Sequence, residues 1–291
     1  MTVFTMKLLA VLSMLVDHSA IFLFPRFIDV KLYMAMRAVG RFAFPVFAFL
    51  IVNGFERSRS IGRYLTRLVA FAVISQIPYV LASDVNHYPQ GSELVVKLSE
   101  RWFVCLIFIV VAAVAWLSTV RLDGTVVWPV LALGMAVLRV EYAGVRILTD
   151  ELNVFYTLAL SLSVISLLDE ACNPRRDVVK LLMQALALFG AFFLIKDNMD
   201  YRTLGVALIT AIWIARGSRF SQAGVIILWC VVEYIVAGHP LAHFACAALS
   251  VVPIVLYKGR QGPPLKLLFY AIYPVHLAIL GALTVYFTFA K

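Results

Sequence analysis

The chain has 291 residues, of which 63% are hydrophobic and only 14% are charged, and its formal net charge is +9. Soluble domains are close to half apolar and a quarter charged, so this composition excludes a soluble globular protein and indicates an integral membrane protein. The Lys and Arg residues stand in short loops between apolar runs, which is typical of positive-inside topology and not of a nucleic-acid surface. We therefore expect contact with a lipid bilayer and no nucleic-acid partner.

Apolar segments recur from residue 4 to residue 288, and each membrane-spanning helix needs roughly 20 apolar residues. The predicted helices cover residues 4–24, 34–56, 61–83, 102–120, 124–140, 151–168, 178–195, 203–216, 221–237, 241–257 and 266–288. No Pro/Gly/Ser-rich linker and no internal repeat divides the chain. The predicted fold class is all-α, a polytopic integral membrane helical bundle of about 10–11 transmembrane helices.

The loop charges predict the orientation of the chain. With a cytoplasmic N-terminus, the inside loops are 56–63, 121–123, 169–180, 216–220 and 258–266, and together they carry twelve Lys/Arg and five Asp/Glu. The largest outside loop, 84–101, is nearly charge-balanced. The positive-inside rule therefore favours a cytoplasmic N-terminus. Eleven helices then place the C-terminus outside, whereas ten place it inside.

The cysteines and two of the histidines predict no metal site. The cysteines are Cys105, Cys172, Cys230 and Cys246, and no two of them stand close enough in the sequence to form a CxxC motif. We interpret them as small buried apolar residues rather than as disulfide or zinc ligands. His239 and His243 have an i,i+4 spacing that can bind a metal, but no third ligand is evident.

Two ionisable residues, Asp17 and His18, are adjacent inside the first predicted helix. An ionisable group in a bilayer is costly unless it is paired or hydrated, so both are functional candidates. Successive helical residues point about 100° apart, so Asp17 can meet a charge while His18 faces a cavity. Arg41 of the second helix, four residues after Arg37, lies at matching depth. We expect it to pair with Asp17 or to stabilise an oxyanion; the alternative is an Asp17–Arg41 pair with a structural role only.

The last predicted helix carries a second intramembrane histidine. His276 lies near the middle of that helix, three residues after Tyr273, so the two side chains share a face. Pro274 between them loosens the helix, as Pro45 does in the second predicted helix. We interpret His276 and Tyr273 as candidate proton partners in catalysis, with a purely structural role as the alternative.

A basic patch lies around the second predicted loop. It consists of Arg57, Arg59, Arg63 and Arg67, and Lys258, Arg260 and Lys266 stand near the last loop. One interpretation is positive-inside topology alone. The other is capture of a phosphate-bearing cosubstrate from the cytoplasm, since arginine forks suit phosphates.

The polar residues stand in sequence blocks that follow one another along nearly the whole chain. The blocks are Leu-Ser-Met-Leu-Val-Asp17-His18, Val39-Gly40-Arg41-Phe42-Ala43-Phe44-Pro45-Val46-Phe47-Ala48-Phe49, Arg63-Tyr64-Leu65-Thr66-Arg67-Leu68, Ile74-Ser75-Gln76-Ile77-Pro78-Tyr79, Leu152-Asn153-Val154-Phe155-Tyr156-Thr157-Leu158, Asp200-Tyr201 with Gly205-Val206, Leu256-Tyr257-Lys258-Gly259-Arg260 and Phe269-Tyr270 to Tyr273-Pro274-Val275-His276-Leu277. As an ordered set they resemble the TraX family. The sequence departs from the family pattern at Asn53, where an acidic residue is expected, at Arg202, where glycine is expected, and at Lys258, where asparagine is expected.

The resemblance implies a single transmembrane acyltransferase-like domain over residues 1–291 in a bacterial inner membrane. TraX proteins are linked to acetylation of the pilin N-terminus in conjugative systems, and the family resembles transmembrane acyl transferases that take acetyl-CoA from the cytoplasm. It places Asp17, His18, Arg41 and His276 at the reaction centre. The implied cosubstrate is acetyl-CoA, without a metal, and the implied acceptor is a pilin or a sugar.

The expected activity is that of a membrane acetyltransferase. His18 acts as a general base on an amine or hydroxyl, or accepts the acetyl group transiently. Arg57, Arg59, Arg63, Arg67 and Arg260 are expected to hold the phosphates of acetyl-CoA. Two alternatives remain. A transporter needs the same buried charges and broken helices, and a non-catalytic pilus or conjugation assembly factor needs them for packing.

Overall fold

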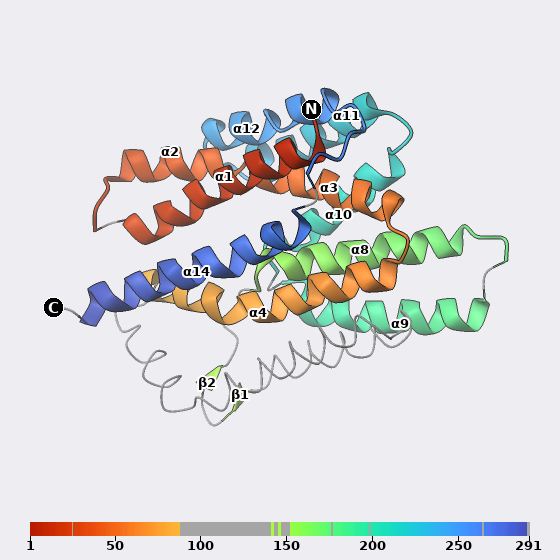
Figure 1. Cartoon of the computed structure of the whole chain (residues 1–291), viewed down its shortest axis with the longest axis horizontal. Coiled ribbons are helices and arrows are strands. Elements are labelled where there is room, and N and C mark those ends of the chain that lie inside the picture. The colour runs from red at the N-terminus through yellow and green to blue at the C-terminus, as the bar shows by residue number, and fades with distance from the viewer. Residues whose placement is uncertain are drawn as a thin grey trace. The chain divides into compact units, whose positions relative to one another are not determined.

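A computed structural model describes residues 1–24, 26–87, 141–142, 145–146, 152–175, 177–197, 199–263 and 265–289 of the chain (Figure 1). Its elements are α1 (Val3–Leu23), α2 (Val30–Gly40), α3 (Ala43–Arg57), α4 (Ile61–His87), β1 (Glu141–Tyr142), β2 (Val145–Arg146), α8 (Val154–Ala171), α9 (Val178–Ile195), α10 (Arg202–Ile214), α11 (Arg219–Cys230), the π-helix η1 (Val231–Val236), α12 (Leu241–Ala248), α13 (Val251–Val255) and α14 (Lys266–Phe289). The predicted helices 102–120 and 124–140, most of the loop 84–101 and Cys105 lie outside the described residues.

The described helices confirm an all-α membrane protein, apart from the two-residue hairpin of β1 and β2. Four helical segments are long and apolar enough to cross a membrane: Val3–Leu23, Val30–Arg57, Val154–Ala171 and Arg219–Val236. Shorter apolar helices cover Val178–Phe193, Arg202–Ile214, Leu241–Val255 and Leu268–Leu283. The total of about 10–11 spans stays a prediction, since it includes helices outside the described part.

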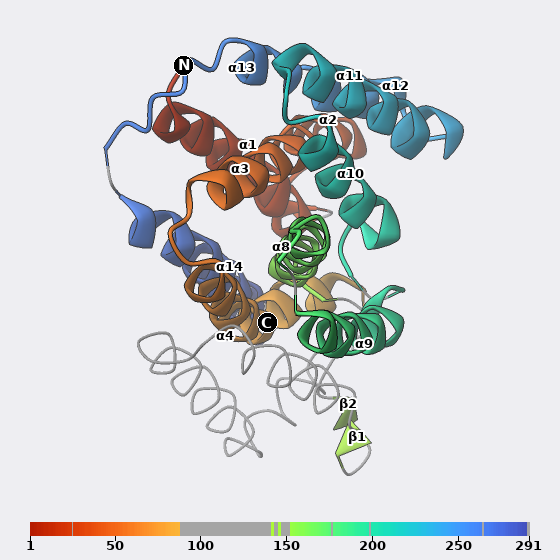
Figure 2. The same cartoon turned by 90° about the vertical axis from the view of Figure 1, so that its right-hand side faces the viewer.

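The chain forms two compact units. The first comprises Met1–Gly54, Leu81–Ser92 and Ala211–Lys291, and the second comprises Phe55–Val80 and Glu93–Thr210. Within the first unit, α1 packs against α2, and α12 packs against both α2 and α11, as the turned view shows (Figure 2). Within the second unit, α8 and α9 lie side by side (Figure 1). The polar residues of α1, α2 and α14 therefore belong to a single unit.

In the first unit, α1 and α14 run parallel. The ring of Phe4 lies 5.7 Å from that of Phe269 near the start of both helices, and the ring of Phe22 lies 6.3 Å from that of Phe287 near their ends. Two parallel helices that both cross a membrane cross it in the same direction.

Two helices predicted as continuous are broken, and a proline explains each break. The helix predicted over residues 34–56 stops at Gly40 and resumes at Ala43, so the break falls at Arg41 and Phe42, four and three residues before Pro45. The helix predicted over 241–257 is likewise interrupted at Leu249, four residues before a proline. Proline has no N–H to bond the carbonyl four residues earlier, and its ring clashes with that carbonyl. Arg41 therefore occupies the C-cap of α2 instead of a helix interior.

Two buried polar side chains of the second unit, Asn153 and Gln76, are hydrogen-bonded to each other. Asn153 caps α8 by accepting a hydrogen bond from the Phe155 N–H at 3.1 Å. Its Nδ2 donates to the Ala72 carbonyl at 2.7 Å and to Gln76 Oε1 at 2.8 Å. Both amide side chains are at most 1% exposed. Such fully paired groups fix the register between α4 and α8 without a cost for unmet hydrogen bonds.

Candidate functional site

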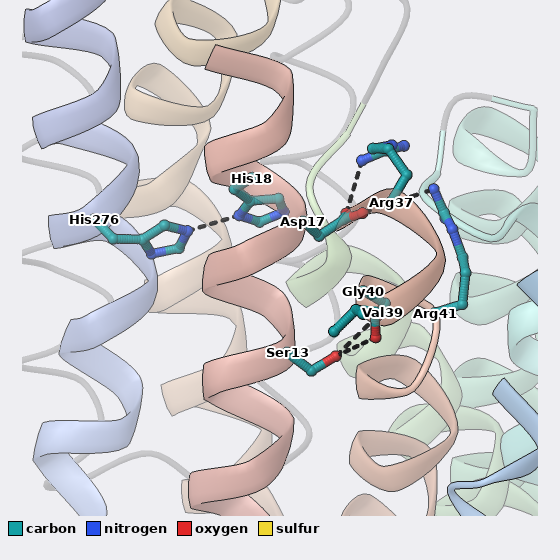
Figure 3. A network of polar contacts seen from close by, with 8 residues as sticks. All are labelled: Ser13, Asp17, His18, Arg37, Val39, Gly40, Arg41 and His276. Carbon is teal, nitrogen blue, oxygen red and sulfur yellow. Dashed lines mark hydrogen bonds and ion pairs between the residues drawn. The ribbon is translucent and has the colours of Figure 1, made fainter. Parts of the chain in front are cut away.

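Asp17 forms an ion pair with Arg37 on the facing helix α2. Arg37 Nη1 donates to Asp17 Oδ2 at 2.7 Å, whereas Arg41 Nη2 lies 4.0 Å from Oδ1 (Figure 3). The three side chains are between 14% and 21% exposed. Both arginines therefore reach Asp17, and Arg37, which the sequence analysis did not assign to this carboxylate, makes the shorter contact. Arg37 still lies on the regular turns of α2 opposite Asp17, while Arg41 lies beyond the end of the helix.

Close backbone contact between α1 and α2 makes this pair possible. A Cβ built on Gly40 would lie 2.3 Å from Asp17 Cβ, so only glycine permits this approach. One turn before Asp17, Ser13 Oγ donates to the Val39 carbonyl at 2.7 Å. That carbonyl lies in the last turn of α2 and also accepts a hydrogen bond from the Phe42 N–H at 3.3 Å. Gly40 and Ser13 thus hold the two helices at the depth of the charges.

His18 turns away from the carboxylate and meets His276 of α14. His18 Nδ1 and His276 Nε2 are 2.6 Å apart, and the two ring planes differ by 7° (Figure 3). The ring of Tyr273 lies 5.9 Å from that of His18 and 5.5 Å from that of His276, edge-on to both. The structure therefore brings His18 together with His276 and Tyr273, which come more than 250 residues later in the sequence.

The backbone of α14 decides which nitrogen carries each proton. His276 Nδ1 lies 2.8 Å from the Ile272 carbonyl oxygen, which can only accept a hydrogen bond. Nδ1 of His276 is therefore protonated, and in the neutral ring Nε2 carries the lone pair. Nε2 must then accept from His18 Nδ1–H. The remaining nitrogen of a neutral His18, Nε2, keeps its lone pair and has no hydrogen-bond partner among the residues that the structure describes.

This arrangement can abstract a proton. A neutral imidazole with a fixed tautomer and an open lone pair is the usual form of a general base. When His18 takes a proton on Nε2, the hydrogen bond from its Nδ1 to His276 stabilises the positive charge that forms. Asp17, on the next face of α1, is held by Arg37 and does not compete for His18.

The basic residues predicted to bind phosphate are divided between the two units. Arg57, Arg59, Arg63 and Arg67 belong to the second unit, and Arg260 belongs to the first. Arg59 and Arg63 are exposed beside the start of α4, where the Ser60 hydroxyl accepts from the Arg63 N–H at 3.4 Å. The guanidinium of Arg67 lies over the ring of Tyr64 at 5.9 Å.

His239 and His243 lie close together near the turn between η1 and α12. Their ring centroids are 6.3 Å apart, and the ring of Tyr234 packs against both. His239 is exposed, whereas His243 is 8% exposed. Within the described residues, no three His, Cys, Asp or Glu side chains come together in a way that could hold a metal ion.

Comparison with known proteins places this chain in a family. The model of the TraX protein family matches residues 3–148 and 107–284, which together span most of the chain. The chain belongs to the TraX family. A probable fimbrial assembly protein FimC, serogroup H1, from Dichelobacter nodosus is 38% identical over 73 residues, which are 25% of this chain and 29% of that protein. No solved structure matches.

The sequence analysis missed two features of this site, the pairing of Arg37 with Asp17 and the role of Gly40. The sequence shows Arg37 four residues before Arg41. Its role as the hydrogen-bonded partner of Asp17, however, depends on where α2 ends. Gly40 stood inside a motif of the family resemblance without an assigned reason. Only the distance between the two helix backbones explains why no side chain fits there.

Proposed function

We propose that this protein is an integral membrane acetyltransferase that moves an acetyl group from cytoplasmic acetyl-CoA to an amine or hydroxyl at the outer side of the membrane. The observation that carries the proposal is the hydrogen-bonded series from the Ile272 carbonyl through His276 to His18. These hydrogen bonds leave His18 Nε2 as an oriented base inside an apolar helix. An ionisable side chain in a membrane costs free energy, so its presence there favours a functional role. The TraX family resemblance favours a pilin N-terminus as the acceptor.

In the proposed reaction, the acceptor amine attacks the carbonyl carbon of the thioester while His18 Nε2 removes the proton from the nitrogen. The new C–N bond forms, the C–S bond breaks, and the CoA thiolate leaves. The His18 imidazolium returns the proton to the thiolate. The products are the N-acetylated acceptor and CoA, and His18 is neutral again. A hydroxyl acceptor reacts in the same way to give an ester.

The other residues of the site serve this base. His276 orients His18 and shares the positive charge of its protonated form. Tyr273 packs edge-on against both rings and restricts their rotation. Arg41, which is less closely engaged with Asp17 than Arg37 is, supplies positive charge for the oxyanion of the tetrahedral intermediate. Two basic clusters are candidates to bind the phosphates of acetyl-CoA: Arg57, Arg59, Arg63 and Arg67 in the second unit, and Arg260 in the first.

The experiment measures CoA release and acetylated product, by thiol titration and mass spectrometry, in membranes that contain each variant. His18→Ala should insert and bind acetyl-CoA but lose transfer by ~10²–10⁴-fold, the usual contribution of a positioned base. His239→Ala removes an exposed histidine of the same unit and should keep full activity. A well-expressed His18→Ala protein that keeps most of its turnover contradicts the role of His18. A wild-type protein that releases no CoA contradicts the proposed function.

A second candidate function is a non-catalytic role in the assembly of pili or fimbriae. The similarity to a protein named as a probable fimbrial assembly protein favours it. The match covers 29% of that relative, so the relative's role does not transfer by similarity alone. An assembly factor would copurify with pilus components and would restore piliation equally well with alanine at position 18.

A further inference from the structure

A second polar cluster of the first unit surrounds Arg219, at the start of α11. Its guanidinium carbon lies 4.4 Å from the centre of the Tyr257 ring. Arg219 Nη1 is buried and makes no hydrogen bond in the part of the chain that the structure describes. A buried guanidinium nitrogen without an acceptor is unfavourable, and such groups in native proteins call for an explanation. An anion that binds here would supply the missing acceptor.

The platform under this arginine is rigid. Tyr257 is 3% exposed, and its hydroxyl donates to Asn53 Oδ1 of α3 at 3.2 Å. Its ring also packs edge-on against Phe49, 5.7 Å away. A guanidinium stacked on a fixed aromatic ring is held in one plane and retains in-plane N–H donors for a ligand. Arg219 is therefore pre-oriented, so it loses little freedom when it binds an anion.

The loop after Tyr257 adds two exposed cations, Lys258 and Arg260. It is shaped by Gly259 and Gly262, which have φ of +75° and +77°. The first residues of the chain hold it in place, because the Val3 N–H donates to the Arg260 carbonyl at 3.0 Å. A Cβ on Gly262 would lie 2.7 Å from that of Phe4, so the contact is close.

No carboxylate of a described residue forms an ion pair with Arg219, Lys258 or Arg260. The cluster therefore has three positive charges, a buried donor and a fixed aromatic face. By contrast, Arg37 is neutralised by Asp17 at 2.7 Å. Uncompensated arginines beside an aromatic ring match a ligand that carries several phosphate oxygens on a planar base.

We infer that Arg219, Tyr257, Lys258 and Arg260 form a binding site for a soluble nucleotide that carries phosphate monoester and diphosphate groups. Under the proposed function, on which this step rests, the nucleotide is the phosphorylated adenosine end of acetyl-CoA. Arg219 binds one phosphate through two N–H donors, and Lys258 and Arg260 bind the others. This assigns Arg219 and Tyr257, which the basic loops alone do not single out.

The test measures binding of adenosine 3′,5′-bisphosphate, which has the phosphates but no thioester, to the full-length protein in phosphatidylcholine nanodiscs by calorimetry. Arg219→Ala should weaken binding at least tenfold, and Arg219→Lys should restore it only in part because the fork is lost. Arg216→Ala is the matched control. Arg216 stands three residues earlier, stacks on Trp213 at 4.1 Å and should not affect binding. Tyr257→Phe keeps the aromatic ring but removes its hydrogen bond to Asn53. This variant therefore tests the ring and the hydrogen bond separately.

An Arg219→Ala protein that elutes as wild type from a sizing column and binds the bisphosphate equally well overturns the inference. Weakening by Arg63→Ala without any effect of Arg219→Ala also overturns it, since the phosphates then bind the second unit. Competition by phosphatidylglycerol nanodiscs that abolishes nucleotide binding would indicate a lipid headgroup site and overturns it as well. Nucleotide binding that depends on Arg219 in a protein that transfers no acetyl group supports the site and contradicts only the proposed function.

Discussion

Replacement of Gly40 by alanine tests the packing that places Asp17. The added Cβ would lie 2.3 Å from Asp17 Cβ and 2.4 Å from both Cγ and Oδ1. These distances are more than 1 Å shorter than ordinary contacts between carbon atoms, which begin near 3.5 Å. Since the Asp17 Cβ is fixed to the backbone of α1, a change of side-chain rotamer cannot relieve the clash. Either α1 and α2 move apart or the carboxylate leaves Arg37.

The magnitude follows from these two responses. Overpacking of a close interface costs ~1–3 kcal/mol, and separation of a buried ion pair that leaves one charge behind costs ~3–5 kcal/mol. Both side chains of the pair are less than a quarter exposed, so solvent screens them only partly. We expect Gly40→Ala to lower the free energy of unfolding by ~2–5 kcal/mol. The upper end of this range corresponds to full loss of the Asp17–Arg37 ion pair. Transfer activity should fall with it, because His18 is the next residue on α1.

The assay is the apparent melting temperature of the detergent-solubilised protein, followed by fluorescence-detected size exclusion after heating. Gly190→Ala is the control, because nothing lies within 4 Å of its added Cβ in the middle of α9. That variant should gain up to about 1 kcal/mol, as glycine-to-alanine changes in helices do. If Gly40→Ala melts at the wild-type temperature and keeps its activity, the close approach of α1 to α2 at Asp17 is refuted.

Two further predictions concern the charge pair and the topology. Arg37→Ala should destabilise the protein by ~3 kcal/mol, because it breaks an ion pair of 2.7 Å with Asp17. Arg41→Ala should cost ~1 kcal/mol or less, because Arg41 lies 4.0 Å from the same carboxylate. Equal losses of stability in thermal melts would contradict this geometry. Cys172 is exposed in the turn between α8 and α9, which the loop charges place in the cytoplasm. In a variant whose other cysteines are serine, a membrane-impermeant maleimide should label Cys172 only after the cells are permeabilised, and labelling of intact cells would invert the topology.

The sequence alone determined the helical membrane class and the positions of most helices. A bilayer imposes a strong rule, that about 20 apolar residues must satisfy their own backbone hydrogen bonds, and this rule is readable from composition. It predicted the helix over residues 178–195 with the bounds that α9 has. It also singled out Asp17, His18 and His276, because ionisable residues stand out in an apolar helix.

Which of these residues meet depends on how the helices pack. His18 and His276 are 258 positions apart in the sequence, and their contact depends on the parallel packing of α1 and α14. Arg37 lies closer to Asp17 than Arg41 does because α2 ends at Gly40. Pro45, which follows the break, determines where that end falls. The helical period restricts each side chain to one face of its own helix, but which helix lies opposite that face, and at what depth, is a property of the packed bundle.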